Sequence, residues 1–274
     1  TPTLSASALY GTTTWGGEHL SGTLFSMDND GGNFQVLHDF AGEPDGGRIP
    51  AGELVLAGST LYGATQSGGN GDDGTLYAYE LSSGEFTLLH EFQGPFASTP
   101  DGENPDGSLL LVGSKLYGVT TNGGANQAGT IFRYDITTGD YGLLHEFEYQ
   151  DAGNGASPHG KLALYNDTLY GMTQRGGTGN LGTLFSIGMD GSGFDVLHSF
   201  RGYTEGDGQE PLGSLTISGT TLFGMTTYGG TEGGGVVFKA KLSNPVPEPG
   251  TMCLLGTGLV GLIGAAYRRK RRQG

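Results

Sequence analysis

Four histidines recur at one place in a repeated motif and are the first candidates for chemistry. They stand second in the segments LHDF, LHEF, LHEF and LHSF, as His38, His90, His145 and His198. Imidazole can bind a metal ion or move a proton, but a metal site needs several ligands that converge on one point. Alternate residues of a strand share a face, so each histidine is expected within an apolar stripe. Two of the expected stripes are Phe34, Val36, His38, Phe40 and Phe86, Leu88, His90, Phe92. The pattern favours structural histidines, packed between repeats and hydrogen-bonded to a neighbour.

Three aspartates form a second candidate set, because each precedes a glycine and lies four or five residues before a proline. They are Asp45, Asp101 and Asp207, with Asp151 in a looser version of the pattern. An Asp-Gly step before proline favours a turn in which the carboxylate accepts backbone N–H groups. Calcium is the alternative, since hard cations take several oxygen ligands. The segment MDNDGG at residues 27–32 alternates its acids but lacks the downstream glutamate of an EF-hand loop. We predict no metal site and no cofactor, with calcium as the alternative.

Aromatic residues in loops complete the candidate ligand face. Trp15 is the only tryptophan, and Tyr228 stands at the equivalent position of the last repeat. Aromatic rings at such places can stack on a sugar ring. The predicted ligand face therefore consists of Trp15, Asp45, Asp101, Asp207 and Tyr228.

Motifs for catalysis are missing from the sequence. The chain has no Gly-x-Ser-x-Gly elbow, no His-Glu-x-x-His, and one cysteine, Cys253, without a partner. Two carboxylates on one face could cleave a glycosidic bond, but no repeat departs from the others in a way that nominates such a pair. We predict that the protein is not an enzyme.

The charge balance excludes nucleic acid as a partner. The chain carries 13 cations against 28 anions, a net charge of −15. Five cations lie together near the C-terminus, so the rest of the chain is more acidic still. Such a body repels nucleic acid and anionic lipid.

Internal repeats organise most of the chain. A Leu-(Tyr/Phe)-Gly triplet ends at Gly11, Gly63, Gly118, Gly171 and Gly224, at spacings of 52, 55, 53 and 53 residues. A Gly-Gly pair, a block of the GTLF type, an LHEF segment and a proline follow in order. Each unit contains four short β-rich segments separated by Gly, Asn and Asp turns, which is typical of hairpins.

Repetition of a four-stranded meander of about 50 residues predicts an all-β protein, a β-propeller of about five four-stranded blades over residues 1–244. The first and last units are incomplete. In a meander, successive turns alternate between two rims, so the long loops between the second and third strands share a rim with the long connections between units. These loops vary and carry much of the acid, which favours binding on that face.

The C-terminal segment, residues 245–274, has a different composition. Residues 252–267 are uncharged and would span about 24 Å as a helix. That length is a marginal span of the ~30 Å hydrocarbon core, and we predict a short transmembrane helix. A cationic cluster follows it: Arg268, Arg269, Lys270, Arg271 and Arg272. The positive-inside rule places this membrane stop on the cytoplasmic side.

The tail closely resembles the PEP-CTERM sorting signal. Val246, Pro247, Glu248 and Pro249, the short apolar segment and the arginine cluster occur in that order at the C-terminus. The pattern LYG…GG…GTLF…LHEF over residues 9–242 resembles GloVer-type tandem repeats, which often accompany such tails. The resemblance implies export in a Gram-negative, exopolysaccharide-forming bacterium, with an exosortase-type membrane enzyme as the processing partner. An uncut C-terminal anchor is the alternative.

These observations predict an exported β-propeller that passes through the inner membrane to the cell surface or extracellular matrix. Its predicted role is non-catalytic binding or structure, with polysaccharide as the candidate partner. The alternative is an extracellular propeller hydrolase or lyase that acts on glycans.

Overall fold

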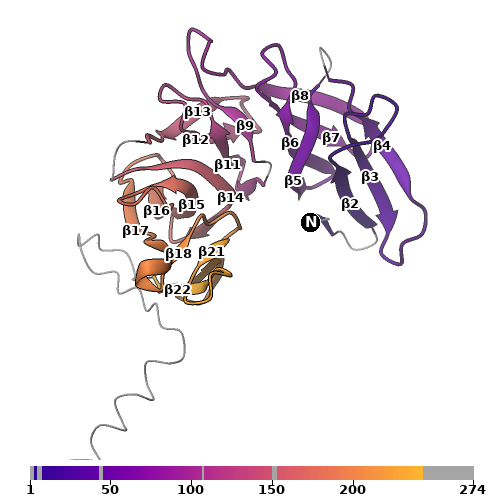
Figure 1. Ribbon diagram of the computed structural model, residues 1–274. Helices are drawn as coiled ribbons and strands as arrows, with labels where there is room; N and C mark the ends of the chain where they lie inside the picture. Colours follow the sequence, from indigo (N-terminus) through magenta and orange to yellow (C-terminus); the bar gives the residue numbers. More distant parts are fainter. Residues whose placement is uncertain (1–2, 5–7, 43–45, 107, 150–152, 243–274) are drawn as a thin grey trace, which may run out of the picture.

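The structure is a computed structural model that describes residues 3–4, 8–42, 46–106, 108–149 and 153–242 (Figure 1). These residues form β-strands and one short 3-10 turn, η1 (Gly202–Glu205). Every strand pair is antiparallel, and in the first, second and fourth sheets each strand pairs with the next one along the chain. In the third sheet the first short strand instead pairs with the third.

The first sheet contains β1 (Thr3–Leu4), β2 (Ala8–Thr13), β3 (Thr23–Asp28) and β4 (Gln35–Asp39). The second contains β5 (Arg48–Ala57), β6 (Thr60–Ser67), β7 (Thr75–Glu80) and β8 (Glu85–Glu91). The third contains β9 (Glu103–Pro105), β10 (Leu110–Val112), β11 (Lys115–Asn122), β12 (Thr130–Asp135) and β13 (Tyr141–Glu146). The fourth contains β14 (Gly155–Tyr165), β15 (Thr168–Gly176), β16 (Thr183–Gly188) and β17 (Asp195–Ser199).

The fifth unit is smaller than the others. Its strands β19 (Thr216–Ser218), β20 (Thr221–Met225) and β22 (Val237–Lys241) form one sheet, and β18 (Gly208–Gln209) pairs with β21 (Tyr228–Gly229). Within the described part of the chain, this unit has no counterpart of β4, β8, β13 and β17. The sheets follow one another along an arc, with the first sheet (indigo) and the fifth (yellow) at opposite ends (Figure 1).

The glycine of each Leu-aromatic-Gly triplet makes room for an aromatic ring on the next strand. A Cβ at Gly63 would lie 2.4 Å from the Tyr77 hydroxyl oxygen. The same clash would occur between Gly118 and Phe132, at 2.4 Å from the ring. Because real side chains do not approach so closely, the packing of β6 against β7 and of β11 against β12 requires glycine at this position.

A glycine and a proline lock each unit to the next. Gly74 has φ +104°, and a Cβ there would lie 2.5 Å from Cδ of Pro105 in the following unit. Asn104, just before that proline, has φ +53° and donates its N–H to the carbonyl oxygen of Asp73 at 2.8 Å. Equivalent contacts join the other units, with prolines Pro50, Pro158 and Pro211. The proline that opens each repeat is therefore a junction residue.

The outermost strand does not keep one face throughout, contrary to the alternation expected from sequence. In the second sheet Leu76 pairs with His90 but Tyr77 pairs with Leu88, so Leu89 is an extra residue in a β-bulge. Phe86 therefore contacts His38 of the first sheet, while His90 contacts Tyr141 of the third. The two halves of the strand face opposite neighbours.

Apolar clusters lie at the junctions between consecutive sheets. One cluster joins Ala64, Leu76 and Phe92 of the second sheet to Leu109, Leu116 and Phe132 of the third. Three further clusters join the first sheet to the second, the third to the fourth and the fourth to the fifth. Each of the three inner sheets is stabilised by the neighbours on its two faces, as in other repeat proteins, whereas the first and fifth sheets have such a neighbour on one face.

The C-terminal sorting and membrane predictions lie outside the described residues. These include the Val-Pro-Glu-Pro motif, the predicted transmembrane helix and the cationic cluster. Within residues 3–242, as far as they are described, no helix is long and apolar enough to cross a membrane.

Candidate binding face and histidine clamps

Each recurring histidine is held between two sheets. His90 Nε2 lies 2.9 Å from Asp101 Oδ2, and its ring stacks on Tyr141 of the next sheet at a centroid distance of 3.9 Å. Asp101 also accepts the backbone N–H of Gln93 at 2.7 Å, so it caps the turn as well. We call this arrangement a histidine clamp: a histidine, the side chain that accepts or donates at its Nε2, and the ring on which it stacks.

The remaining histidines occupy the same place with different partners. His198 Nε2 lies 2.8 Å from Asp207 Oδ2, and His145 Nε2 lies 3.0 Å from Asn154 Oδ1. Asp45, which stands near His38 in the sequence pattern, lies outside the described residues. Burial lowers the pKa values of His38 and His145 below the ordinary histidine value. His38, His90 and His145 stack on a ring of the next sheet, whereas the described ring that His198 contacts is Phe200 of its own segment, edge-on, so this clamp lacks a stacked ring. Each histidine lies at its own junction, apart from the others.

Asn154 takes the place that the sequence pattern assigned to an aspartate. Asp151 lies outside the described residues, whereas Asn154 precedes Gly155 and lies four residues before Pro158. Asn154 also caps its own turn, since its Oδ1 accepts the Gly155 N–H at 2.9 Å. Asn154 lies as far before its proline as Asp101 and Asp207 lie before theirs, so this spacing in the sequence could have identified Asn154.

The long loops meet on one rim, as the meander topology requires. Residues 14–22, 68–74, 123–129, 177–182 and 226–236 form the loops within units, and the connections between units start after β4, β8, β13 and β17. In the second unit Asp73 Oδ2 accepts the N–H of Gly94 at 2.8 Å. In the third, Glu146 Oε1 accepts the N–H of Ala125 at 2.7 Å. We call this rim the long-loop face.

A constant backbone displays different side chains on the long-loop face. The Gly-Gly pair and the glycine before the next strand have positive φ in each loop within a unit. Each of these loops places one further residue in the left-handed region, at Leu20, Asp72, Gln127, Asn180 and Gly233. The carbonyl oxygens of Gly17 and its counterparts accept the N–H of the residue three positions later, for example that of Asp72 at the Gly69 oxygen at 3.1 Å. A fixed frame with variable side chains is the usual layout of a recognition surface.

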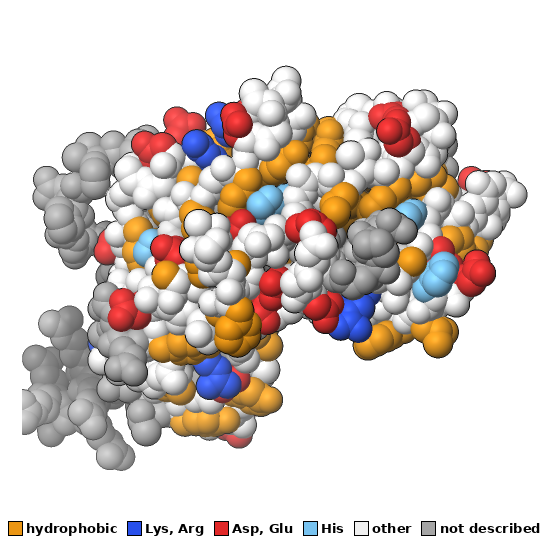
Figure 2. Space-filling model, turned by 90° about the horizontal axis from the view of Figure 1, so that it is seen from above, with side chains coloured by type: hydrophobic (Ala, Val, Ile, Leu, Met, Phe, Trp, Pro, Cys, Tyr) orange, Lys and Arg blue, Asp and Glu red, His pale blue; other side chains and the backbone are white. Residues whose placement is uncertain are grey.

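The exposed aromatic side chains gather on this face. Trp15 is 67% exposed and Tyr228 is 46% exposed, as expected for surface rings. Three further exposed rings lie in the connections between units: Phe96, Tyr149 and Tyr203. Sequence reasoning missed these three because they have no fixed position in the repeat. Seen from above, hydrophobic and acidic side chains are interspersed, with few Lys or Arg (Figure 2).

The two candidate aspartates that the structure describes, Asp101 and Asp207, point into the protein. The side chains of Asp101 and Asp207 are 15% and 19% exposed and are occupied by the clamps. Among the described residues, no group of three or more His, Cys, Asp or Glu side chains is placed to hold a metal ion. The long-loop face therefore presents aromatic rings more than free carboxylates at the predicted positions.

One pair of acidic residues, Asp73 and Glu103, has no acidic counterpart at the other junctions between units. Burial and the charge of Asp73 raise the pKa of Glu103. The equivalent of Glu103 in the second unit is Arg48, which instead donates hydrogen bonds to Asp72. Those bonds and the Gly68 N–H hold the pKa of Asp72 below its usual value, although partial burial opposes this.

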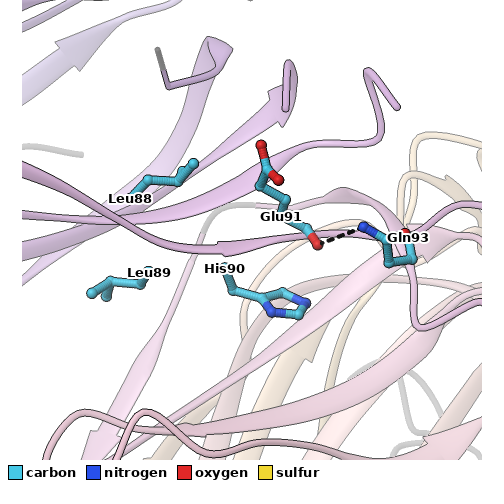
Figure 3. A pocket seen from close by; sticks show the side chains of 5 residues that line it. All are labelled: Leu88, Leu89, His90, Glu91 and Gln93. Atoms are coloured by element: carbon cyan, nitrogen blue, oxygen red, sulfur yellow. Dashed lines mark hydrogen bonds between the residues drawn. The ribbon is translucent and has the colours of Figure 1, made fainter. Parts of the chain in front are cut away.

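A shallow cavity of about 330 Å³ lies beside β8 (Figure 3). It is lined by Leu88, Leu89, His90, Glu91 and Gln93. The Gln93 amide donates to the Glu91 carbonyl oxygen at 3.4 Å, and His90 is held by its clamp. The Glu91 carboxylate accepts a hydrogen bond from the Asn70 amide at 2.8 Å, so the polar side chains of this cavity are hydrogen-bonded within the protein.

Antiparallel four-stranded meanders packed along an arc define the class of this molecule, a β-propeller-like protein. The fold is similar to that in the crystal structure of a nidogen/laminin complex, with a TM-score of 0.52 and 13% identity over 86% of this chain and 72% of that chain. It is also similar to TolB from Acinetobacter baumannii, with a TM-score of 0.51 and 13% identity over 86% of this chain and 49% of that chain. At such identities the similarity concerns the fold alone. No curated protein sequence matches the chain.

The particular family follows from the repeated sequence. Residues 2–154 and 150–246 match the Gloeobacter/Verrucomicrobia repeat, and the chain belongs to this family. Residues 245–272 match the PEP-CTERM protein-sorting motif. The protein therefore carries a signal for export toward the cell surface and for exosortase-type processing.

Proposed function

We propose that this exported protein is a non-catalytic binding component of the cell surface or extracellular matrix that holds an uncharged polysaccharide on its long-loop face. Its five repeats are the blades of an open propeller. The tail crosses the inner membrane as a short helix during sorting and is cut near Pro247 to Pro249, which removes the cationic cluster.

The distribution of exposed aromatic rings carries the proposal. Seven aromatic side chains are exposed within the described residues, and five of them lie on the long-loop face. The other two, Phe34 and Phe223, lie on the first and last sheets. Rings combined with loop amides and hydroxyls are the groups that bind a sugar, whose ring has apolar faces and polar edges. The acidic body would repel an acidic polysaccharide, which favours an uncharged one.

Affinity electrophoresis of the full chain in detergent, through gels that contain neutral polysaccharides, tests this proposal. The wild-type protein should be retarded by at least one neutral glycan. Trp15→Ala and Tyr203→Ala should each weaken binding about fivefold, because a stacked ring contributes about 1 kcal/mol. Phe223→Ala is the matched control, since it removes an exposed ring from the last sheet, and its retardation should stay unchanged. Equal retardation of all three variants would exclude the long-loop face.

Processing is tested by the intact mass of protein recovered from the cell surface. The expected mass lacks Arg268 to Arg272 and the apolar segment before them. Full-length protein at the surface would show instead that the tail is a permanent anchor.

A glycan hydrolase or lyase is the second candidate function, and the Asp73–Glu103 pair favours it. A carboxyl group with a raised pKa beside a second carboxylate is the arrangement that glycoside cleavage uses. The equivalent pairs at the next two junctions are Ala128 with Ala156 and Leu181 with Gln209, so the pair of acids is not part of the repeat. Release of reducing ends that Glu103→Gln abolishes and Glu85→Gln leaves intact would replace the binding proposal with this one.

A further inference from the structure

The last sheet exposes side chains at positions that the repeat buries elsewhere. Met225 on β20 is 59% exposed, whereas Ala64, Val119 and Met172 at the same position are at most 3% exposed. Val237 on β22 is 76% exposed, whereas its equivalents Leu76, Ile131 and Leu184 are at most 1% exposed. In the inner units these side chains pack against the following sheet, and the fifth sheet has none described after it.

The first sheet exposes the complementary face. Phe34 is 55% exposed and contacts Phe25 of its own sheet. Its equivalents are Phe86, Tyr141 and Phe194, and each is covered by a histidine of the preceding sheet at 3.7–3.9 Å. In the inner units this ring also packs on the apolar cluster that contains the equivalents of Met225 and Val237. The described part of the fifth unit has no counterpart of the strand that carries the histidine, so Met225 and Val237 are the apolar side chains that the fifth sheet offers to this face.

Charges on the two faces match as well. At the junction of the third and fourth sheets, a depression of about 480 Å³ is lined by Arg133 of β12 and by Asp190 of the β16–β17 turn. Ser192 and, more weakly, the charge of Arg133 hold the pKa of Asp190 below its usual value. Lys239 on β22 is the repeat equivalent of Arg133, and Asp30 in the β3–β4 turn is that of Asp190. Both are exposed.

The two turns also share their geometry, which places the acids alike. Asp30 Oδ1 accepts the Gly32 N–H at 2.9 Å, and Asp190 Oδ1 accepts the Ser192 N–H at 2.9 Å. A copy of the first sheet set against the fifth sheet in the manner of an inner junction would therefore bring Asp30 toward Lys239.

We propose that the fifth sheet of one molecule packs against the first sheet of a second copy, head to tail. Val237 and Met225 of one copy then cover Phe34 and Phe25 of the next, and Lys239 faces Asp30. Because the two surfaces differ, the contact is heterologous and repeats from copy to copy instead of closing a two-fold dimer. The long-loop face takes no part in this contact, so the proposal is independent of polysaccharide binding.

Charge reversal tests the register of the contact. The full chain in detergent should associate with increasing concentration in sedimentation velocity, and Lys239→Asp or Asp30→Lys alone should weaken association about tenfold through like-charge contact. A mixture of the two single variants should associate again, because the carboxylate introduced into one variant meets the ammonium group introduced into the other. Glu85→Lys, the same charge change beside an inner turn, should behave as wild type.

Several results would overturn the proposal. A wild-type chain that stays monomeric at every concentration would show that another partner or further repeats cover these faces. Association that neither Lys239→Asp nor Asp30→Lys weakens would show that the copies associate through the C-terminal tail in the detergent micelle and not through the two sheets. Loss of association in each variant without rescue on mixing would exclude the head-to-tail register, and far-ultraviolet circular dichroism of each variant separates that result from misfolding.

Discussion

Replacing Tyr77 with phenylalanine removes one buried hydroxyl group from the junction of the first two sheets. Among the described residues, the Tyr77 hydroxyl is the one buried side-chain polar atom without a hydrogen-bond partner. The side chain is 0% exposed, and the equivalent positions of the other units hold Phe25, Phe132, Phe185 and Phe238. An aromatic ring without the hydroxyl already fits the same surroundings four times in this chain.

The expected gain follows from the cost of burying an unpaired polar group. That cost is about 1–3 kcal/mol, and the ring itself keeps its packing. Tyr77→Phe should therefore stabilise the protein by about 2 kcal/mol. For a domain of this size, Tm should rise by about 4–8 °C.

Ionisation of the same group gives a second observable. Burial raises the pKa of Tyr77 well above its ordinary value of 10. At pH values above about 10, the phenol therefore stays neutral in the folded state but loses its proton in the unfolded chain. This contribution to stability is complete below about pH 10 and is lost as pH rises from there toward the folded pKa. Tyr77→Phe should lose less stability between about pH 10 and 11 than the wild type.

Urea unfolding and differential scanning calorimetry measure both effects. Phe132→Tyr is the matched control, since it introduces the hydroxyl at the equivalent inner position, close to Gly118, and should destabilise by a similar amount. A drop in stability for Tyr77→Phe would refute the reasoning, because it would mean that the hydroxyl is hydrogen-bonded in solution, for example by a buried water molecule.

Two other perturbations address the junctions. Gly74→Ala should lower the urea midpoint more than Gly58→Ala. Both glycines have positive φ, but only at Gly74 would a Cβ clash, because it would lie 2.5 Å from Cδ of Pro105. Equal losses of stability in the two variants would show that the contact between Gly74 and Pro105 adjusts at little cost. Thermal stability should fall as pH drops from about 7 to 5, because burial holds the pKa of His145 below the ordinary value of 6.5 and the unfolded chain takes up the proton first. His145→Gln should flatten this slope, and a slope that is unchanged would assign the pH dependence to other groups.

Much of the fold could be predicted because its signals are local. Turn residues at fixed spacing separate the β-rich segments, and each turn forms from a few adjacent residues. The structure accordingly pairs Leu61 with Leu56 and with Tyr79 in the expected meander. The packing of histidines between neighbouring sheets was predicted from their place among apolar residues, although the bulge breaks the alternation on which that prediction relied. Asn154 could have been found by spacing alone.

The sequence by itself determined the repeat, the order of strands, the sorting motif and the rim on which the long loops lie, because each depends on neighbouring residues or on the parity of a meander. Only the tertiary structure decided which neighbour each half of β8 faces, since the bulge at Leu89 satisfies two adjoining sheets at once. The juxtaposition of Asp73 with Glu103 likewise exists only where two units meet. The exposure of Phe34 and Val237 also depends on tertiary structure, because a side chain at these repeat positions is buried only when a neighbouring sheet covers it.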